Sequence, residues 1–106
     1  MNIGSLYAVK KFCWLLFPTK EIAVLDAEGV TTKAATTPDS DTAAHAARIW
    51  SRRLNCEVNY FSPDFYIVFL EEDGKYKKVL TSDGRIGWTW FDKNYKSCFE
   101  EVKVAV

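Results

Sequence analysis

Two tight-turn signals in the second half of the chain constrain its fold more than any other feature. Asp73-Gly74 and Ser82-Asp83-Gly84 are typical of short β-hairpin connections, because glycine reaches the backbone angles that such turns need. The runs around them, residues 65–70, 76–81 and 86–90, are rich in β-branched and aromatic side chains. Short strands joined by tight turns in so small a chain predict a small barrel or a strongly bent antiparallel sheet.

Further strand patterns lie around these turns. Apolar residues alternate with polar ones over residues 54–60, which predicts a strand with one buried face. Residues 65–70 form a continuous apolar run, which is typical of a central strand covered on both faces. Near the end of the chain, Phe99, Val102 and Val104 indicate a last short strand.

The first part of the chain is also predicted to be β. Residues 3–25 are mostly strand-forming, and Pro18 breaks the run. Residues 22–25 form a second short apolar segment, and residues 26–29 have the composition of a turn. We therefore expect two early strands followed by a turn.

One helix is predicted, within an insertion at about residues 31–54. A loop rich in threonine and alanine opens the insertion, and Thr37 can then cap a helix that has Pro38 at its first position. The two sides of this helix differ, with an apolar stripe at Ala43, Ala46, Ala47, Trp50 and Leu54 and a polar side at His45, Arg48 and Arg52. As an alternative, residues 49–54 already belong to the following strand.

Length and composition limit the class of protein. The chain has 106 residues, of which 48% are hydrophobic, and its 14 basic residues balance 14 acidic ones. The length predicts a single domain over residues 1–106, the composition excludes wholesale disorder, and the zero net charge argues against a strongly basic nucleic-acid-binding protein. The longest apolar run, residues 12–17, is far shorter than the roughly 20 residues of a membrane helix, so we expect no membrane partner. Three widely spaced cysteines predict reduced thiols and a cytoplasmic location.

No combination of residues predicts catalysis or metal binding. A nucleophilic Cys–His pair would need His45 beside Cys13, Cys56 or Cys98, and no signature motif places it there. The same four residues have the composition of a zinc site but lack the close spacing of zinc-ligand pairs. We therefore expect no enzyme activity, no cofactor and no metal, with a cysteine-dependent enzyme as a further alternative.

Residues 84–95, Gly-Arg-Ile-Gly-Trp-Thr-Trp-Phe-Asp-Lys-Asn-Tyr, resemble the end of an SH3 domain. That family has a glycine pair, an aromatic residue, and then an Asn-Tyr in a one-turn 3₁₀ helix before the final strand. Residues 4–9 are similar to the opening SH3 strand, which carries a binding tyrosine, here Tyr7. The hairpin at Asp73-Gly74 then corresponds to the distal hairpin of the family.

The resemblance implies a fold more than it implies a ligand. No proline follows Trp88, although a proline there walls the peptide groove of the family, and residues 26–53 are longer than the family needs. Asn94-Tyr95 also lies two residues further from Gly87 than is usual. We therefore expect a mainly β (α+β) fold, either a small SH3-like barrel or a strongly bent antiparallel sheet with one helix in an insertion, and no particular preference for proline motifs.

Aromatic residues are the candidate binding groups. The chain has 16 of them, 11 within residues 60–99, and so small a domain cannot bury them all fully. We expect an exposed aromatic patch that binds a protein partner by burying ring area, as in a small accessory or assembly protein of the kind that phages encode. The residues assigned to this patch are Tyr7, Trp88, Trp90 and Tyr95.

The alternative is a nucleic-acid-binding barrel, in which aromatic rings stack on bases and basic residues hold phosphates. The basic residues assigned to this role are Arg48, Arg52, Lys75, Lys77 and Lys78. Acidic residues 71–73 adjoin the lysines, and this arrangement favours an ordinary solvated face. The sequence identifies neither the partner nor the oligomeric state.

Overall fold

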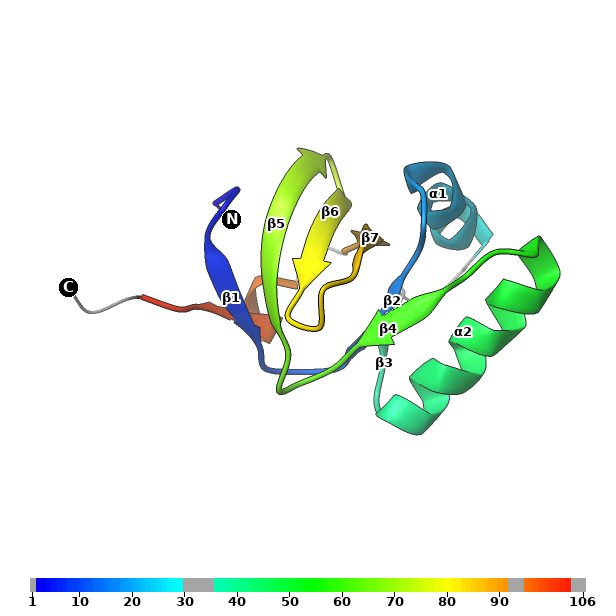
Figure 1. Cartoon of the computed structure of the whole chain (residues 1–106), viewed down its shortest axis with the longest axis horizontal. Coiled ribbons are helices and arrows are strands. Elements are labelled where there is room, and N and C mark those ends of the chain that lie inside the picture. The colour runs from blue at the N-terminus through cyan, green and yellow to red at the C-terminus, as the bar shows by residue number, and fades with distance from the viewer. Residues whose placement is uncertain (1, 30–35, 92–94, 104–106) are drawn as a thin grey trace.

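The computed structural model describes residues 2–29, 36–91 and 95–103. The elements of this part of the chain are β1 (Leu6–Val9), β2 (Cys13–Leu16), α1 (Lys20–Gly29), β3 (Thr36–Thr37), α2 (Ser40–Leu54), β4 (Asn59–Phe61), β5 (Tyr66–Asp73), β6 (Tyr76–Thr81), β7 (Ile86–Trp90), the 3₁₀ helix η1 (Tyr95–Cys98) and β8 (Phe99–Glu101). The antiparallel strands and two helices confirm the prediction of a mainly β, α+β fold (Figure 1). The predicted loop at residues 31–35 and Val104 lie outside the described residues.

The larger sheet has five antiparallel strands in the order β7-β6-β5-β1-β8. Its two hairpins confirm the turn prediction, since Asp73 pairs with Tyr76 across the first hairpin, and the second connects β6 to β7. Gly74 and Gly84 have positive φ angles of 59° and 87°, which a glycine adopts without strain. Strand β8 is the edge strand beside β1, so the first and last strands of the described chain are neighbours in the sheet (Figure 1).

The smaller sheet has the order β3-β2-β4, and an isolated antiparallel bridge between Phe17 and Trp88 joins it to the larger sheet. The backbone N–H of Phe17 donates to the oxygen of Trp88, and the N–H of Trp88 donates to the oxygen of Phe17, each at 2.7 Å. Gly87 allows this approach, because a Cβ atom there would lie 2.7 Å from the oxygen of Phe17. Within the described residues neither sheet closes on itself, so the architecture is that of two bent, open sheets.

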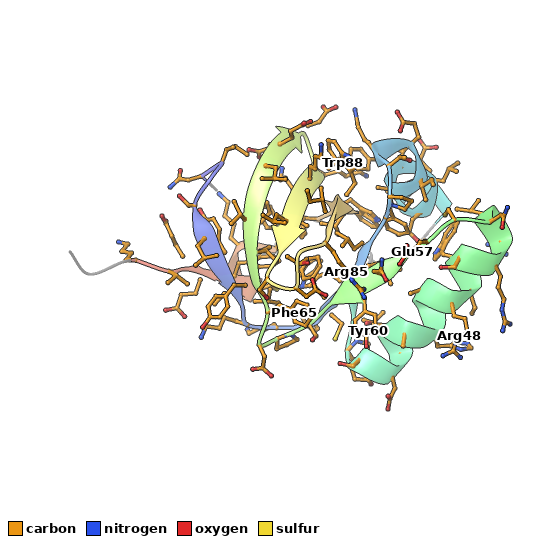
Figure 2. All side chains as sticks on the ribbon, in the orientation of Figure 1. Arg48, Glu57, Tyr60, Phe65, Arg85 and Trp88 are labelled. Carbon is orange, nitrogen blue, oxygen red and sulfur yellow. The ribbon has the colours of Figure 1, made fainter. Side chains whose placement is uncertain are left out.

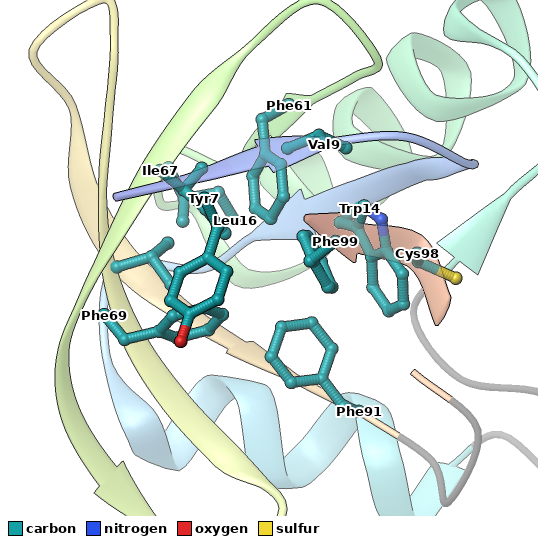
Figure 3. Close-up of a cluster of buried hydrophobic side chains, with 11 residues drawn as sticks. Tyr7, Val9, Trp14, Leu16, Phe61, Ile67, Phe69, Phe91, Cys98 and Phe99 are labelled. Atoms are coloured by element: carbon teal, nitrogen blue, oxygen red, sulfur yellow. The ribbon is translucent and has the colours of Figure 1, made fainter. Parts of the chain in front are cut away.

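The main core lies between the two sheets (Figure 3). Trp14 of β2 packs edge-on against Phe91 with ring centroids 4.8 Å apart, and Phe91 contacts Phe99 of β8 at 5.3 Å. Phe69 of β5 contacts both phenylalanines. Buried aromatic rings in edge-to-face contact contribute both hydrophobic area and about 1 kcal/mol per pair beyond it. This core holds the ends of β7 and β8 together.

The prediction of strand at residues 22–25 and of a turn at residues 26–29 is wrong, because both segments lie in α1. The hydroxyl of Thr19 accepts a hydrogen bond from the backbone N–H of Ile22 and thereby caps the first turn. Ile22 and Ala23 then pack into a second apolar cluster, together with Trp90 of β7. The chain therefore has two helices in its described residues, where the sequence predicted one.

The second helix, α2, is helical over its whole length, so the alternative of a strand at residues 49–54 is wrong. Its N-cap is Asp39, and Thr37 instead belongs to β3. The predicted polar side is confirmed, since His45, Arg48 and Arg52 are exposed. The strand predicted over residues 54–60 is shorter in the structure. Leu54 is the last residue of α2, and β4 begins only at Asn59.

One face of the larger sheet is open to solvent along β5. Residues Leu6, Val68, Leu80 and Ile86, which we call the aliphatic row, pair in register across four strands on this face. Tyr66 on the same face is 47% exposed, so the prediction that residues 65–70 are covered on both faces is wrong.

Neither α1 nor α2 has the length and hydropathy to cross a membrane, and the described residues contain no other candidate helix.

Candidate functional site

The four aromatic residues assigned to the binding patch lie in different surroundings. Tyr7 is only 5% exposed and packs edge-on against Phe69, so its assignment to an exposed patch is wrong. Trp88 is half-buried and lines a hollow of about 540 Å³, whose remaining walls are mostly polar residues of α1 and the end of β5. Trp90 is only 6% exposed, so its assignment to an exposed patch is also wrong, but together with the half-buried Tyr95 it lines another hollow, which is the candidate site.

The candidate site, which we call the aromatic hollow, has a volume of about 580 Å³. Its lining consists of Glu72, Gly74, Lys75, Lys77, Trp90, Phe91 and Tyr95. The first β-hairpin supplies the polar half of this lining, and the end of β7 and the start of η1 supply the aromatic half. Hollows of this size with an apolar lining and a few polar groups are the usual form of a binding site for a small ligand or a short peptide segment.

Neighbouring elements fix the positions of the three aromatic rings. Tyr95 stacks on Phe91 with ring centroids 4.7 Å apart and an angle of 15° between the ring planes. The indole N–H of Trp90 donates to the carboxylate of Asp26 in α1 at 2.7 Å. The backbone N–H of Phe91 donates to the oxygen of Lys75, which ties the end of β7 to the hairpin turn. The aromatic half of the hollow is therefore preformed.

Two lysines give the polar half its charge. Lys77 is buried, and its ammonium group donates to the Oε1 atom of Glu72 at 2.7 Å and to the oxygen of Gly74. The hydrogen bond from Lys77 and its positive charge lower the pKa of the Glu72 carboxyl. Lys75 is exposed at the rim, with its ammonium nitrogen 5.3 Å from the ring centroid of Trp90. The hollow thus combines apolar rings with two ammonium groups and one carboxylate.

The basic residues assigned to nucleic-acid binding do not form one surface. Lys77 is buried, contrary to that assignment, and Lys78 lies on the other side of β6, where it pairs with Glu71 at 3.6 Å. Arg48 and Arg52 belong to α2, and Figure 2 shows Arg48 on that helix, away from the hairpin of β5 and β6. Only Lys75 and Lys77 of the five line the aromatic hollow.

The cysteines and the histidine lie on separate elements. Cys13 is buried in β2, where burial raises the pKa of its thiol, and Cys98 is buried at the end of η1. Cys56 is half-buried after α2, and His45 lies on the exposed side of that helix. Across residues 2–29, 36–91 and 95–103, no three His, Cys, Asp or Glu side chains lie close enough to hold a metal ion. The arrangement in the aromatic hollow suits non-covalent binding.

The sequence named four of the seven lining residues, but under two different functions. It missed Phe91, Glu72 and Gly74. The available signal was the register of the hairpin. Asp73 pairs with Tyr76 across a two-residue turn, and Tyr76 pairs with Trp90, so the turn lies beside the end of β7. The comparisons with known protein families, with curated proteins and with solved structures found no match to this chain.

Proposed function

We propose that this protein is a non-catalytic binding module that holds a protein partner in the aromatic hollow. One observation carries the proposal: Trp90, Phe91 and Tyr95 line a preformed hollow that has an exposed lysine at its rim. Aromatic residues in such positions supply most of the affinity of protein interfaces, because they bury a large rigid area at a small cost in entropy.

The arrangement of the strands supports an SH3-like barrel as the finer description of the fold. The 3₁₀ helix η1 comes directly before β8, as the resemblance to SH3 domains implies, and β8 pairs with β1. SH3-like barrels serve many functions, so the fold alone does not determine the ligand. The hollow lies at the end of β7 beside η1, and it is the chemistry of its lining that supports binding of a partner.

A display library of random peptides, selected against the immobilised full chain, tests the proposal. The selected peptides are synthesised, and their affinities are measured by tryptophan fluorescence and calorimetry. We expect Tyr95→Ala to weaken binding about tenfold or more, and Tyr95→Phe to retain it, because the stacked ring supplies the contact area. Tyr66→Ala is the matched control, since Tyr66 lies on the open face of the sheet and should change the affinity less than about twofold.

Two outcomes would overturn the proposal. Selected peptides that bind Tyr95→Ala as tightly as the native chain would place the binding surface elsewhere, provided that circular dichroism shows the variant to be folded. Quenching of tryptophan fluorescence by a mixed oligonucleotide at low salt, with a steep loss of affinity as salt is added, would favour nucleic-acid binding instead. The separation of Arg48 and Arg52 from the hairpin lysines is the reason that we expect no such response.

A further inference from the structure

We propose that the ligand of the aromatic hollow is the C-terminal residue of the partner polypeptide, with an apolar side chain and a free carboxylate. This inference rests on the proposed function and specifies the chemistry of the partner. Its three supports are the buried ammonium group of Lys77, the charge balance of the lining and the aromatic surface beside them.

The buried ammonium group supplies a binding contact for an anion. The side chain of Lys77 is 4% exposed and lines the hollow. An ammonium group has three N–H donors, and within the described residues Glu72 and Gly74 accept two hydrogen bonds from it. The ammonium nitrogen also lies 5.8 Å from the ring centroid of Tyr95, and a ligand oxygen that enters the hollow beside that ring can accept the third hydrogen bond. In such a poorly solvated position, a charge-assisted hydrogen bond is stronger than it would be in water.

The charges of the lining favour a ligand with one negative charge. Among the lining residues that the structure describes, Lys75 and Lys77 contribute two positive charges and Glu72 contributes one negative charge, which is an excess of one positive charge. The ammonium group of Lys75 lies over the rings of Trp90 and Tyr76, and among the described residues no carboxylate forms an ion pair with it. A single carboxylate bound in the hollow would balance the charges of these described residues.

The apolar part of the lining determines which kind of carboxylate-bearing group fits the hollow. The half-buried Tyr95 and the small accessible edges of Trp90 and Phe91, which are 6% and 1% exposed, offer apolar surface but few hydrogen-bonding groups. A backbone that passes through the hollow would therefore leave peptide N–H and C=O groups without partners. A C-terminal residue places its carboxylate next to its own apolar side chain and brings only one peptide N–H. It therefore matches the hollow better than an aspartate or glutamate within a chain.

Peptides with and without a C-terminal charge test the inference. The probes are hexapeptides ending in Leu, Val or Phe, each prepared as the free acid and as the C-terminal amide, and titrated against the full chain. We expect the free acids to bind at least about tenfold more tightly than the amides. Equal affinities would overturn the inference and leave the proposed function in place. Tight binding of 3-phenylpropionate alone, at the affinity of the peptides, would instead assign the hollow to a small acid and overturn both.

Two substitutions test the charges without disturbing the buried Lys77. Lys75→Gln should weaken the free acids about fivefold and the amides by less than about twofold, whereas Lys78→Gln, on the other side of β6, should change the affinity for neither. Glu72→Gln should tighten the free acids at least about threefold, because it removes the carboxylate that competes for Lys77. Glu71→Gln is its matched control. A loss of affinity in Glu72→Gln, or equal effects of the two lysine substitutions, would overturn the inference.

Discussion

At the scale of single residues, Asp26 joins α1 to the larger sheet through a buried carboxyl group. It is 2% exposed, and its Oδ2 atom accepts the indole N–H of Trp90 at 2.7 Å. Burial raises the pKa of the Asp26 carboxyl, while hydrogen bonds from Trp90 and Trp50 act in the opposite direction. A group whose pKa is higher in the folded chain stabilises the fold below its unfolded pKa, and this stabilisation is lost as the pH rises through the folded pKa.

The substitution Asp26→Asn isolates this effect, because asparagine keeps an oxygen for the indole N–H but cannot ionise. We expect the native free energy of unfolding, minus that of Asp26→Asn, to fall as the pH rises from about 4 towards neutrality. Urea unfolding at a series of pH values measures the difference. Parallel pH profiles for the two proteins would show that the carboxyl has the same pKa in the folded and unfolded chains.

Gly87 is the residue on which the junction of the two sheets depends. A Cβ atom at this position would lie 2.7 Å from the backbone oxygen of Phe17 and from the Cγ atom of Leu16. The backbone oxygen of Phe17, the residue after β2, accepts the N–H of Trp88 in the bridge to β7 and cannot move away without breaking that bridge. We therefore expect Gly87→Ala to lower the free energy of unfolding by about 2 kcal/mol or more. Gly29→Ala is the control, because no atom of the described residues lies within 4 Å of the added Cβ atom, and it should be neutral or slightly stabilising. Thermal unfolding of both variants measures the difference.

At the scale of elements, the start of α2 depends on one aspartate. Asp39 has an extended backbone, with φ at −148°, and its Oδ1 atom accepts the N–H of Thr42 at 2.8 Å. This hydrogen bond lowers the pKa of the Asp39 carboxyl. We expect Asp39→Ala to lower the Tm by about 4 °C at neutral pH, and Asp41→Ala, which has only the helix dipole to lose, to lower it less. The difference in Tm between the native protein and Asp39→Ala should become smaller as the pH falls and the Asp39 carboxyl is protonated.

The elements that could be predicted from the sequence are those with local signals. Gly74 and Gly84 mark both hairpin turns, because each has a positive φ angle that glycine adopts without strain whatever its neighbours are. The helix α1 was mistaken for a strand because residues 22–25 are apolar and partly β-branched, which suits either structure in so short a run. Its helical form depends on the Thr19 cap and on packing against Trp90, which is 64 residues from Asp26 in the sequence. Tertiary contacts of this kind leave no local pattern.

At the scale of the whole molecule, the candidate site could be predicted only in part for the same reason. Aromatic and basic residues in the second half of the chain favour a binding site, and Trp90, Tyr95, Lys75 and Lys77 line one hollow, although Trp90 and Lys77 are buried. Whether a given ring is exposed depends on which face of which strand it occupies. Tyr7 lies on the core face of β1, so its aromatic character says nothing about the surface. The hollow itself exists because the hairpin turn and η1 meet at the end of β7.

The larger sheet has one covered face and one partly open face. Two aliphatic residues on adjacent strands, one on each face, allow the stability contributions of the two faces to be compared. Val79 of β6 is fully buried in the main core, whereas Ile86 of β7, in the aliphatic row, is 58% exposed. Truncating a buried aliphatic side chain removes hydrophobic contact and leaves a cavity, while truncating an exposed one removes little. We expect Val79→Ala to lower the free energy of unfolding by about 2 kcal/mol and Ile86→Ala by less than about 1 kcal/mol, as measured by urea unfolding. If both substitutions cost the same, and the cost of Ile86→Ala grows with protein concentration, then a second copy of the chain covers the aliphatic row in solution and the face is not free.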